Sequence, residues 1–151
     1  IRLGIFELAL IAAGMTLVGS LMPKPPAQVD AQWLPFSEKT IAANVDEGKT
    51  VFVDITADWC LTCKANKKFT LTQGEVAEKL FHSHVVAMQG DWTNPDPAIS
   101  EFLHKFNRFG VPFNVVFGPA APQGLVLPEL LVSKSAIVLD ALEKANPQPK
   151  P

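Results

Sequence analysis

Three short apolar runs divide the chain and predict the strands of one sheet. They cover residues 51–56, 84–89 and 113–118, and the first is apolar at nearly every position. A strand that is apolar on both of its sides belongs to a sheet with helices packed on both faces. The pattern therefore predicts a buried central sheet.

Between and around these runs, apolar residues recur at the spacing of helices. Ser37 can cap a helix that ends near Asp46, and residues 64–80 are helical in composition but broken near residues 72–74. Two further helices are predicted, and each carries one apolar face. The first is opened by residues 94–97 and ends near Gly110, with the apolar residues Ile99, Phe102, Leu103 and Phe106. The second is capped by Ser133, with the apolar residues Ile137, Val138, Ala141 and Leu142.

The third strand leads into a predicted hairpin. Residues 119–124 form its turn, and residues 125–127 are a short edge strand that Pro128 ends. The order strand, helix, strand, helix, hairpin, helix predicts an α/β fold with a mixed central sheet flanked by helices.

An apolar segment precedes this globular unit. Residues 8–22 are uncharged, and the longer stretch 3–22 contains one charge, that of Glu7. This longer stretch is long enough to span a bilayer. Arg2 favours a start in the cytoplasm, which would place the rest of the chain on the outer side. A remnant of a signal peptide and a helix of the soluble core are the alternatives.

The predicted organisation follows from these segments. Because the chain begins with Ile1, we expect it to be a piece of a longer protein, with residues 1–22 as the end of a transmembrane segment. Residues 23–31 form a proline-rich linker, residues 32–145 one globular domain, and residues 146–151 a disordered tail.

Composition narrows the possible functions. The chain has 151 residues, 48% of them hydrophobic, and a formal net charge of −2. This is enough for one domain with a sizeable core, and no basic stripe interleaved with aromatic residues is present, so nucleic-acid binding is not expected. The two cysteines cannot form a disulfide scaffold, and one Cys-x-x-Cys pair lacks the second pair of a structural zinc site.

The two cysteines, Cys60 and Cys63, are separated by two residues and follow the first strand directly. Cys60 is placed where the strand ends and a helix begins, so its thiolate would face unpaired N–H groups and the positive end of the helix dipole. The spacing lets the pair close a small disulfide and open it again, as exchange chemistry requires. The sequence thus predicts a redox centre without any further cofactor.

Asp54 is a charged residue within the first, otherwise apolar strand. A carboxyl group in such a strand is desolvated, which raises its pKa toward the range in which it can act as a base. The alternative is an aspartate that accepts hydrogen bonds from nearby backbone at the end of a strand.

Two segments carry a family resemblance. Residues 59–64, Trp-Cys-Leu-Thr-Cys-Lys, and residues 110–112, Gly-Val-Pro, resemble the thioredoxin fold in their order and in their places beside strands. Residues 57–64 after a membrane helix are more narrowly similar to the C-terminal periplasmic domain of DsbD-type transmembrane disulfide reductases. Within that group, residues 90–97 and 111–124 look most like the ScsB branch, named for suppression of copper sensitivity.

The resemblance assigns roles to individual residues. Cys60 matches the exposed attacking cysteine, Cys63 the resolving cysteine, and Asp54 the buried acid that moves the proton of the resolving thiol. Substrate contacts are expected from Trp59, Val111, Pro112 and Phe113, with Pro112 at the position of the cis-proline of the family. For Trp59, an indole packed under the loop is the alternative. No metal ligand is assigned.

The same resemblance implies a function, and the sequence differs from the family pattern at two places. The domain would be a protein-disulfide reductase in the periplasm of a bacterial inner-membrane protein, with the membrane-embedded domain of the same protein as electron donor and disulfide-containing periplasmic proteins as acceptors. Leu61 and Thr62 replace the Gly-Pro of many thioredoxins, and these two residues help to set the reduction potential. Lys67 stands where some DsbD-type domains carry a second acid, which would leave Asp54 to move protons alone.

Two other classes of function compete with this one. The copper association of the branch and the pair His82 and His84 suggest a module that binds copper or another soft metal, although nothing places these histidines near the cysteines. A purely structural disulfide is the second alternative. So short a loop constrains the unfolded chain little, which disfavours that interpretation.

Overall fold

The structure is a computed structural model that describes residues 32–82 and 84–147. The predicted membrane segment at residues 1–22, the linker at residues 23–31 and the last four residues of the predicted tail lie outside the described residues. Within the part that is described, no helix is long and apolar enough to cross a membrane.

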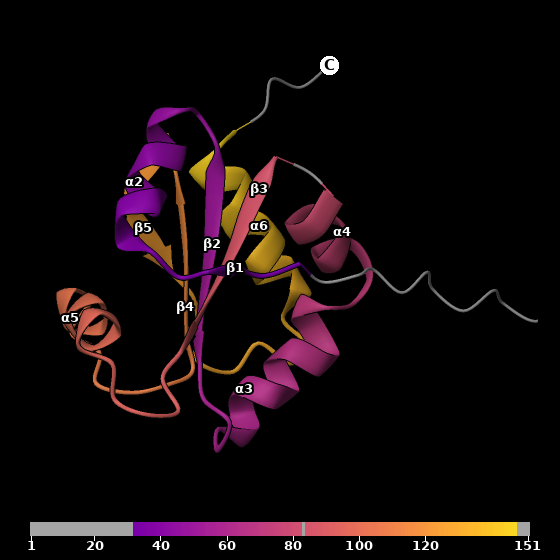
Figure 1. Cartoon of the computed structure of the whole chain (residues 1–151). Helices are drawn as coiled ribbons and strands as arrows, with labels where there is room; N and C mark the ends of the chain where they lie inside the picture. Colours follow the sequence, from indigo (N-terminus) through magenta and orange to yellow (C-terminus); the bar gives the residue numbers. More distant parts are fainter. Residues whose placement is uncertain (1–31, 83, 148–151) are drawn as a thin grey trace, which may run out of the picture.

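A five-stranded mixed sheet forms the centre of the domain (Figure 1). In spatial order its strands are β1 (Leu34–Pro35), β3 (Val85–Asp91), β2 (Thr50–Thr56), β4 (Phe113–Gly118) and β5 (Ala121–Val126). β3 runs parallel to its two neighbours β1 and β2, whereas β4 is antiparallel to β2 and β5 is antiparallel to β4. The predicted mixed sheet is confirmed, and β1 is an additional short strand that the sequence pattern missed.

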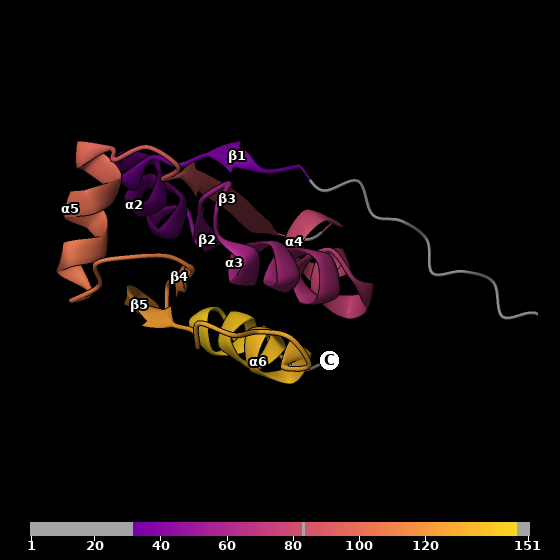
Figure 2. The same cartoon turned by 90° about the horizontal axis from the view of Figure 1, so that it is seen from below.

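Helices cover both faces of this sheet (Figures 1 and 2). One face carries α2 (Glu38–Asp46) and α5 (Pro97–Lys105). The other carries α3 (Leu61–Asn66), the π-helical turn η1 (Lys67–Leu71), α4 (Gly74–His82) and α6 (Ser135–Ala145). Each face has its own apolar cluster, so the core consists of two layers separated by the sheet.

Side-chain caps explain two of the helix starts. The Ser37 side chain accepts a hydrogen bond from the backbone N–H of Thr40, and the Asp96 side chain accepts one from Ile99 ahead of α5, whose first position is Pro97. These caps satisfy backbone donors that have no partner inside a helix. The predicted starts of α2 and α5 are confirmed.

Three predicted boundaries are wrong. Ser133 does not cap the last helix, because it adopts a left-handed φ of 61° and α6 begins two residues later. α5 ends at Lys105 rather than near Gly110, since Asn107 turns the chain with a left-handed φ of 54°. β5 starts at Ala121, within the predicted turn.

The early start of β5 has a physical reason. An edge strand tolerates a proline such as Pro122, because one of its sides needs no hydrogen-bonded partner. Gly124 has a φ of 87°, and the pairing of β5 with β4 is irregular between Val116 and Gly118. Turn-forming residues therefore lie inside a bulged edge strand here.

Candidate active site

The two cysteines form a disulfide at the carboxyl end of β2. The S–S distance between Cys60 and Cys63 is 2.08 Å and their Cα atoms are 5.3 Å apart. Cys60 occupies the N-cap position of α3, and its sulfur accepts a hydrogen bond of 3.1 Å from the backbone N–H of Cys63. The predicted junction of strand and helix is confirmed, and it places a backbone N–H at the sulfur of Cys60, a donor of the kind that stabilises a thiolate.

The two cysteines differ little in exposure, although the family resemblance implied that Cys60 would be the exposed one. Cys60 is 6% exposed and Cys63 is 3% exposed, so in the disulfide form neither is freely accessible. They form a small apolar cluster with Ala57, against which Val111 packs. The greater exposure of Cys60 and its capping position agree with its assignment as the attacking residue.

A cis peptide bond joins Val111 to Pro112, as the family resemblance implied. These two residues are half-buried and directly precede β4. Since Val111 packs on the cysteine cluster, the loop that holds the cis bond lies against the disulfide. Both residues are thus in position to contact a substrate that reaches Cys60.

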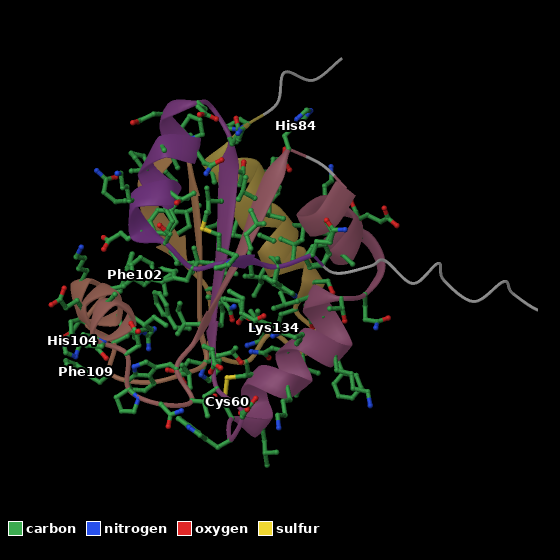
Figure 3. All side chains as sticks on the ribbon, in the orientation of Figure 1. Cys60, His84, Phe102, His104, Phe109 and Lys134 are labelled. Atoms are coloured by element: carbon green, nitrogen blue, oxygen red, sulfur yellow. A yellow bond between two sulfur atoms is a disulfide. The ribbon has the colours of Figure 1, made fainter. Side chains whose placement is uncertain are left out.

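Phe113 does not fulfil the role predicted for it. It is buried, and its ring lies 6.0 Å from that of Phe102 and 5.2 Å from that of Phe106, on the face covered by α2 and α5. Phe109, by contrast, is exposed, and its ring lies 5.0 Å from that of His104 in a tilted arrangement (Figure 3). Sequence reasoning missed Phe109 because adjacency to Pro112 was the only signal considered.

Asp54 lies in the middle of β2 on the face that α3 and η1 cover. Its side chain is 4% exposed, and its Oδ1 accepts a hydrogen bond of 2.8 Å from Nδ2 of Asn114, its register partner on β4. Burial raises the pKa of the Asp54 carboxyl, as its place in an apolar strand predicted. The nearest partners are side chains, so the alternative of an aspartate bonded to backbone is not supported.

Lys67 changes the expected electrostatics of this acid. Its Nζ lies 3.4 Å from Oδ2 of Asp54, an ion pair rather than a well-formed hydrogen bond. The sequence had predicted that Asp54 would move protons alone, because Lys67 stands where an acid is found in some relatives. The structure adds a positive charge beside Asp54, and the role of Asp54 in moving protons stays a prediction.

A cavity of about 410 Å³ opens beside the resolving cysteine. Its walls include Cys63 and Lys67 from the helical side and Gln89 and Asp91 from β3. Asp54 is not part of the wall, but Lys67 is, so this side chain connects the cavity with the buried carboxyl group. The cavity is therefore linked to the buried carboxyl group of Asp54 through one side chain.

A hydrogen-bonded clamp holds the loop in front of Cys60. The Thr93 hydroxyl accepts a bond of 2.8 Å from the backbone N–H of Asp58, and its backbone carbonyl accepts one of 3.2 Å from Nε1 of Trp59. Thr93 in turn donates from its N–H and hydroxyl groups to Asp91 at the end of β3. These bonds lower the pKa of Asp91 and fix Trp59, whose side chain is largely exposed beside the site.

The histidine pair considered as a metal site is not beside the cysteines. His84 is exposed just before β3, whereas Cys60 follows β2, and because β2 and β3 are parallel the two residues lie at opposite ends of the sheet (Figure 3). The side chain of His82 lies outside the described residues. Among the described residues, no group of three or more His, Cys, Asp or Glu could hold a metal ion.

Together these groups can perform thiol–disulfide exchange. The site has a pair of bonded sulfurs, a backbone N–H donor on the sulfur of Cys60, and a buried carboxyl group that lies beside Lys67 of the segment following Cys63. A family model described as thioredoxin-like matches residues 32–119, more than half of the chain. The chain belongs to the thioredoxin-like family. Its Cys60–Cys63 pair makes this domain a thiol–disulfide oxidoreductase of that fold.

Two relatives named thiol:disulfide interchange protein DsbD are similar in sequence to this thioredoxin-like domain. The protein from Ralstonia nicotianae is 30% identical over 162 residues, which cover 97% of this chain and 26% of the relative. The protein from Pseudoalteromonas atlantica is 39% identical over 82 residues, which cover 54% of this chain and 13% of the relative. The chain thus spans about a quarter or less of the length of these relatives.

Solved structures support the same fold. The oxidised C-terminal domain of DsbD from Neisseria meningitidis matches with a TM-score of 0.56 and 23% identity, covering 71% of this chain and 97% of that domain. Its reduced form matches with a TM-score of 0.54 and covers 69% of this chain and 92% of that domain. The thioredoxin-like fold is therefore shared over nearly all of the solved domain.

Proposed function

We propose that this domain is the C-terminal, electron-delivering domain of a DsbD-type protein-disulfide reductase. The observation that carries the proposal is the Cys60–Cys63 disulfide, which packs against the cis-proline loop and follows β2, the strand that contains the buried Asp54. The similarity to two DsbD proteins supports the direction of electron flow, because the Cys-x-x-Cys spacing alone serves oxidants and reductants alike.

In the proposed reaction, the Cys60 thiolate attacks one sulfur of a partner disulfide. A mixed disulfide forms with the attacked sulfur, the S–S bond of the partner breaks, and the other partner sulfur leaves as a thiolate. The Cys63 thiol then gives its proton to Asp54, and the Cys63 thiolate attacks the sulfur of Cys60 and releases the second partner thiolate. Two electrons pass to the partner, and the Cys60–Cys63 disulfide is restored.

The wider setting is part of the proposal. Residues 1–22 would be the end of a membrane helix and residues 23–31 a stiff linker, so the domain would work in the periplasm of an inner-membrane protein. The membrane-embedded domain of the same protein would reduce Cys60–Cys63 again. The ScsB branch is supported by residues 90–97, which contain Thr93 of the loop clamp, and by residues 111–124.

The site also supports a way of binding partners. Three large apolar residues are exposed and lie close in the sequence to the cysteines or to the cis-proline loop: Trp59, Leu61 and Phe109. Such residues would dock the partner chain beside Cys60, while the backbone at Val111 and Pro112 holds its extended segment. The acceptors would be disulfide-containing periplasmic proteins.

A trapping experiment tests the reaction. In the Cys63→Ser variant the second step is blocked, so a mixed disulfide through Cys60 should accumulate with periplasmic proteins and disappear on addition of a reductant. The double variant Cys60→Ser, Cys63→Ser is the control and should trap nothing. If Cys63→Ser forms no adduct, the proposed reaction is wrong.

The reduction potential tests the direction. A value for the Cys60–Cys63 couple near that of thioredoxin, about −270 mV, supports an electron donor. A value near that of strong periplasmic oxidants, about −120 mV, contradicts the reductase. The measurement is an equilibrium titration of the whole chain against a glutathione or dithiothreitol buffer.

A further inference from the structure

The two carboxyl oxygens of Asp54 have different partners, and one of them is paired with a cation. Oδ1 accepts the hydrogen bond from Asn114, while Oδ2 accepts no hydrogen bond among the described residues and lies 3.4 Å from Nζ of Lys67. The side chain of Lys67 is 29% exposed, against 4% for that of Asp54. The pair thus has one buried member and one that reaches solvent.

The local fold places Lys67 for this contact. It is the first residue of the π-helical turn η1, four residues after Cys63, on the helix that carries the cysteines. Its Nζ also lies 5.4 Å from the centre of the Trp33 ring, which stabilises the ammonium. The helix that positions Cys63 therefore also positions the cation beside Asp54.

The surrounding charges leave Lys67 as the cation that acts on Asp54. The cavity wall holds Lys64 and Lys67 together with the acids Asp58 and Asp91. Asn114 on β4 and Gln89 on β3, the register neighbours of Asp54, are neutral. Burial raises the pKa of Asp54, whereas the charge of Lys67 is the largest of the effects that lower it.

We propose that Lys67 is a positioning residue that keeps the Asp54 carboxyl able to accept the proton of Cys63. Burial favours the protonated form of a carboxyl group in this apolar strand, whereas a nearby cation favours the carboxylate, which is the form that accepts a proton. A lysine in place of an acid at this position reverses the sign of the charge that acts on Asp54. The inference rests on the proposed reaction, in which Cys63 must lose its proton before it attacks Cys60.

The first test measures Asp54 directly. In the oxidised whole chain, the ¹³C signal of the Asp54 side-chain carboxyl is followed by NMR against pH. Lys67→Gln, which keeps hydrogen-bond donors but removes the charge, should shift the midpoint upward, and Lys67→Arg should restore it. Lys67→Met is a second neutral variant whose apolar stem can still pack on Trp33, should Lys67→Gln fail to fold.

Lys68→Gln is the matched control. It removes the same charge one residue along the helix, where the Lys68 side chain is exposed and its Nζ lies 5.4 Å from the centre of the Phe69 ring. It should leave the Asp54 midpoint unchanged. The inference is overturned if the neutral Lys67 variants titrate like the wild type, or if Lys68→Gln shifts the midpoint as much as Lys67→Gln.

The second test separates the two steps of exchange. Reduced chain reacts with 5,5′-dithiobis(2-nitrobenzoate), which releases one coloured thiolate when Cys60 attacks and a second when Cys63 resolves the mixed disulfide. The Lys67→Gln variant should shift the pH profile of the second release to higher pH and leave that of the first in place. Equal profiles for the second release in the variant and the wild type would contradict the inference.

The two tests distinguish failure of the inference from failure of the proposed function. If Cys63→Ser traps no partner but the Asp54 midpoint still depends on Lys67, the reductase is wrong and the coupling of Lys67 with Asp54 stands. If partners are trapped but the midpoint is independent of Lys67, the reductase stands and the role of Lys67 is wrong.

Discussion

The same two central strands present very different surfaces on the two faces of the sheet. On the face covered by α2 and α5, β2 and β4 contribute only hydrocarbon and aromatic side chains: Val51, Val53, Ile55, Phe113, Val115 and Phe117. On the face covered by α3 and η1, the same strands place Asp54 beside Asn114, 2.8 Å apart. Both faces bury apolar side chains, but on these two strands only the second face carries an acid, and the burial of that acid opposes folding at neutral pH.

This difference shows how a small domain can keep a reactive group in its core. Alternate residues of a strand point to opposite faces, so a polar residue at one position leaves the packing on the other side intact. The apolar face packs four aromatic rings around Phe102, namely those of Phe36, Phe106, Phe113 and Phe117. Its stability can offset the desolvation of Asp54.

The largest expected effect comes from breaking the apolar face. Phe102→Ala removes the centre of the aromatic cluster and should lower the free energy of unfolding by about 3–5 kcal/mol. Because Phe102 lies across the sheet from Asp54, the pH dependence of the second exchange step should not change in the folded variant. Unfolding in urea and the two-step release assay measure both quantities, and a shifted pH profile would show that the faces are coupled.

The next effect comes from removing the acid from the other face. Asp54→Asn takes away the proton acceptor and should slow the second step by about a hundredfold, the lower end of the usual range for general base catalysis. The free energy of unfolding, in contrast to the rate, should increase in this variant. The native carboxyl keeps its proton at a pH where the unfolded chain, with the ordinary value of 3.8, has lost it.

The sign of that stability change can be measured against pH. Since the native state binds the additional proton, the wild type loses stability as the pH rises from near 3.8 through the raised pKa of Asp54, whereas Asp54→Asn has no such loss. Free energies of unfolding at a series of pH values should therefore diverge in favour of the variant. Parallel curves for the two proteins would contradict a raised pKa.

The smallest effect is expected from making the reactive face more apolar. Asn114→Val removes the hydrogen bond to Asp54, which lowers the pKa of that carboxyl less than the charge of Lys67 does. The Asp54 midpoint should rise, but by less than in Lys67→Gln. Val115→Ala, the next residue on the opposite face, is the control for altered packing and should leave the midpoint in place.

Much of this organisation could be predicted from the sequence. Strands β2, β3 and β4, the break between η1 and α4, and the caps Ser37 and Asp96 follow from local patterns that the structure also obeys. The Cys60–Cys63 disulfide was predicted from spacing, because two residues between cysteines leave their sulfurs within reach. The cis bond before Pro112 was predicted only through the family resemblance.

The remaining contacts are tertiary and have no local signal. Lys67 and Asp54 are 13 positions apart in the sequence, and Asn114 and Asp54 are partners only because β4 pairs with β2 in one register. The burial of Phe113 was missed for a related reason: a strand's first residue faces the core or the surface according to the register, which the sequence does not state. The clamp at Thr93 likewise depends on how two loops meet.

The π-helical turn η1 has a consequence for comparison with relatives. In η1 the backbone N–H of Thr72 bonds to the carbonyl of Lys67, five residues earlier, so the turn contains one residue more than an α-helical turn. Positions counted from Cys63 can be equated between this domain and a relative as far as Lys67. Beyond it, over the residues of η1, a relative with an uninterrupted α-helix would be out of phase by one residue, and an alignment without a gap there would match residues at different positions around the helix.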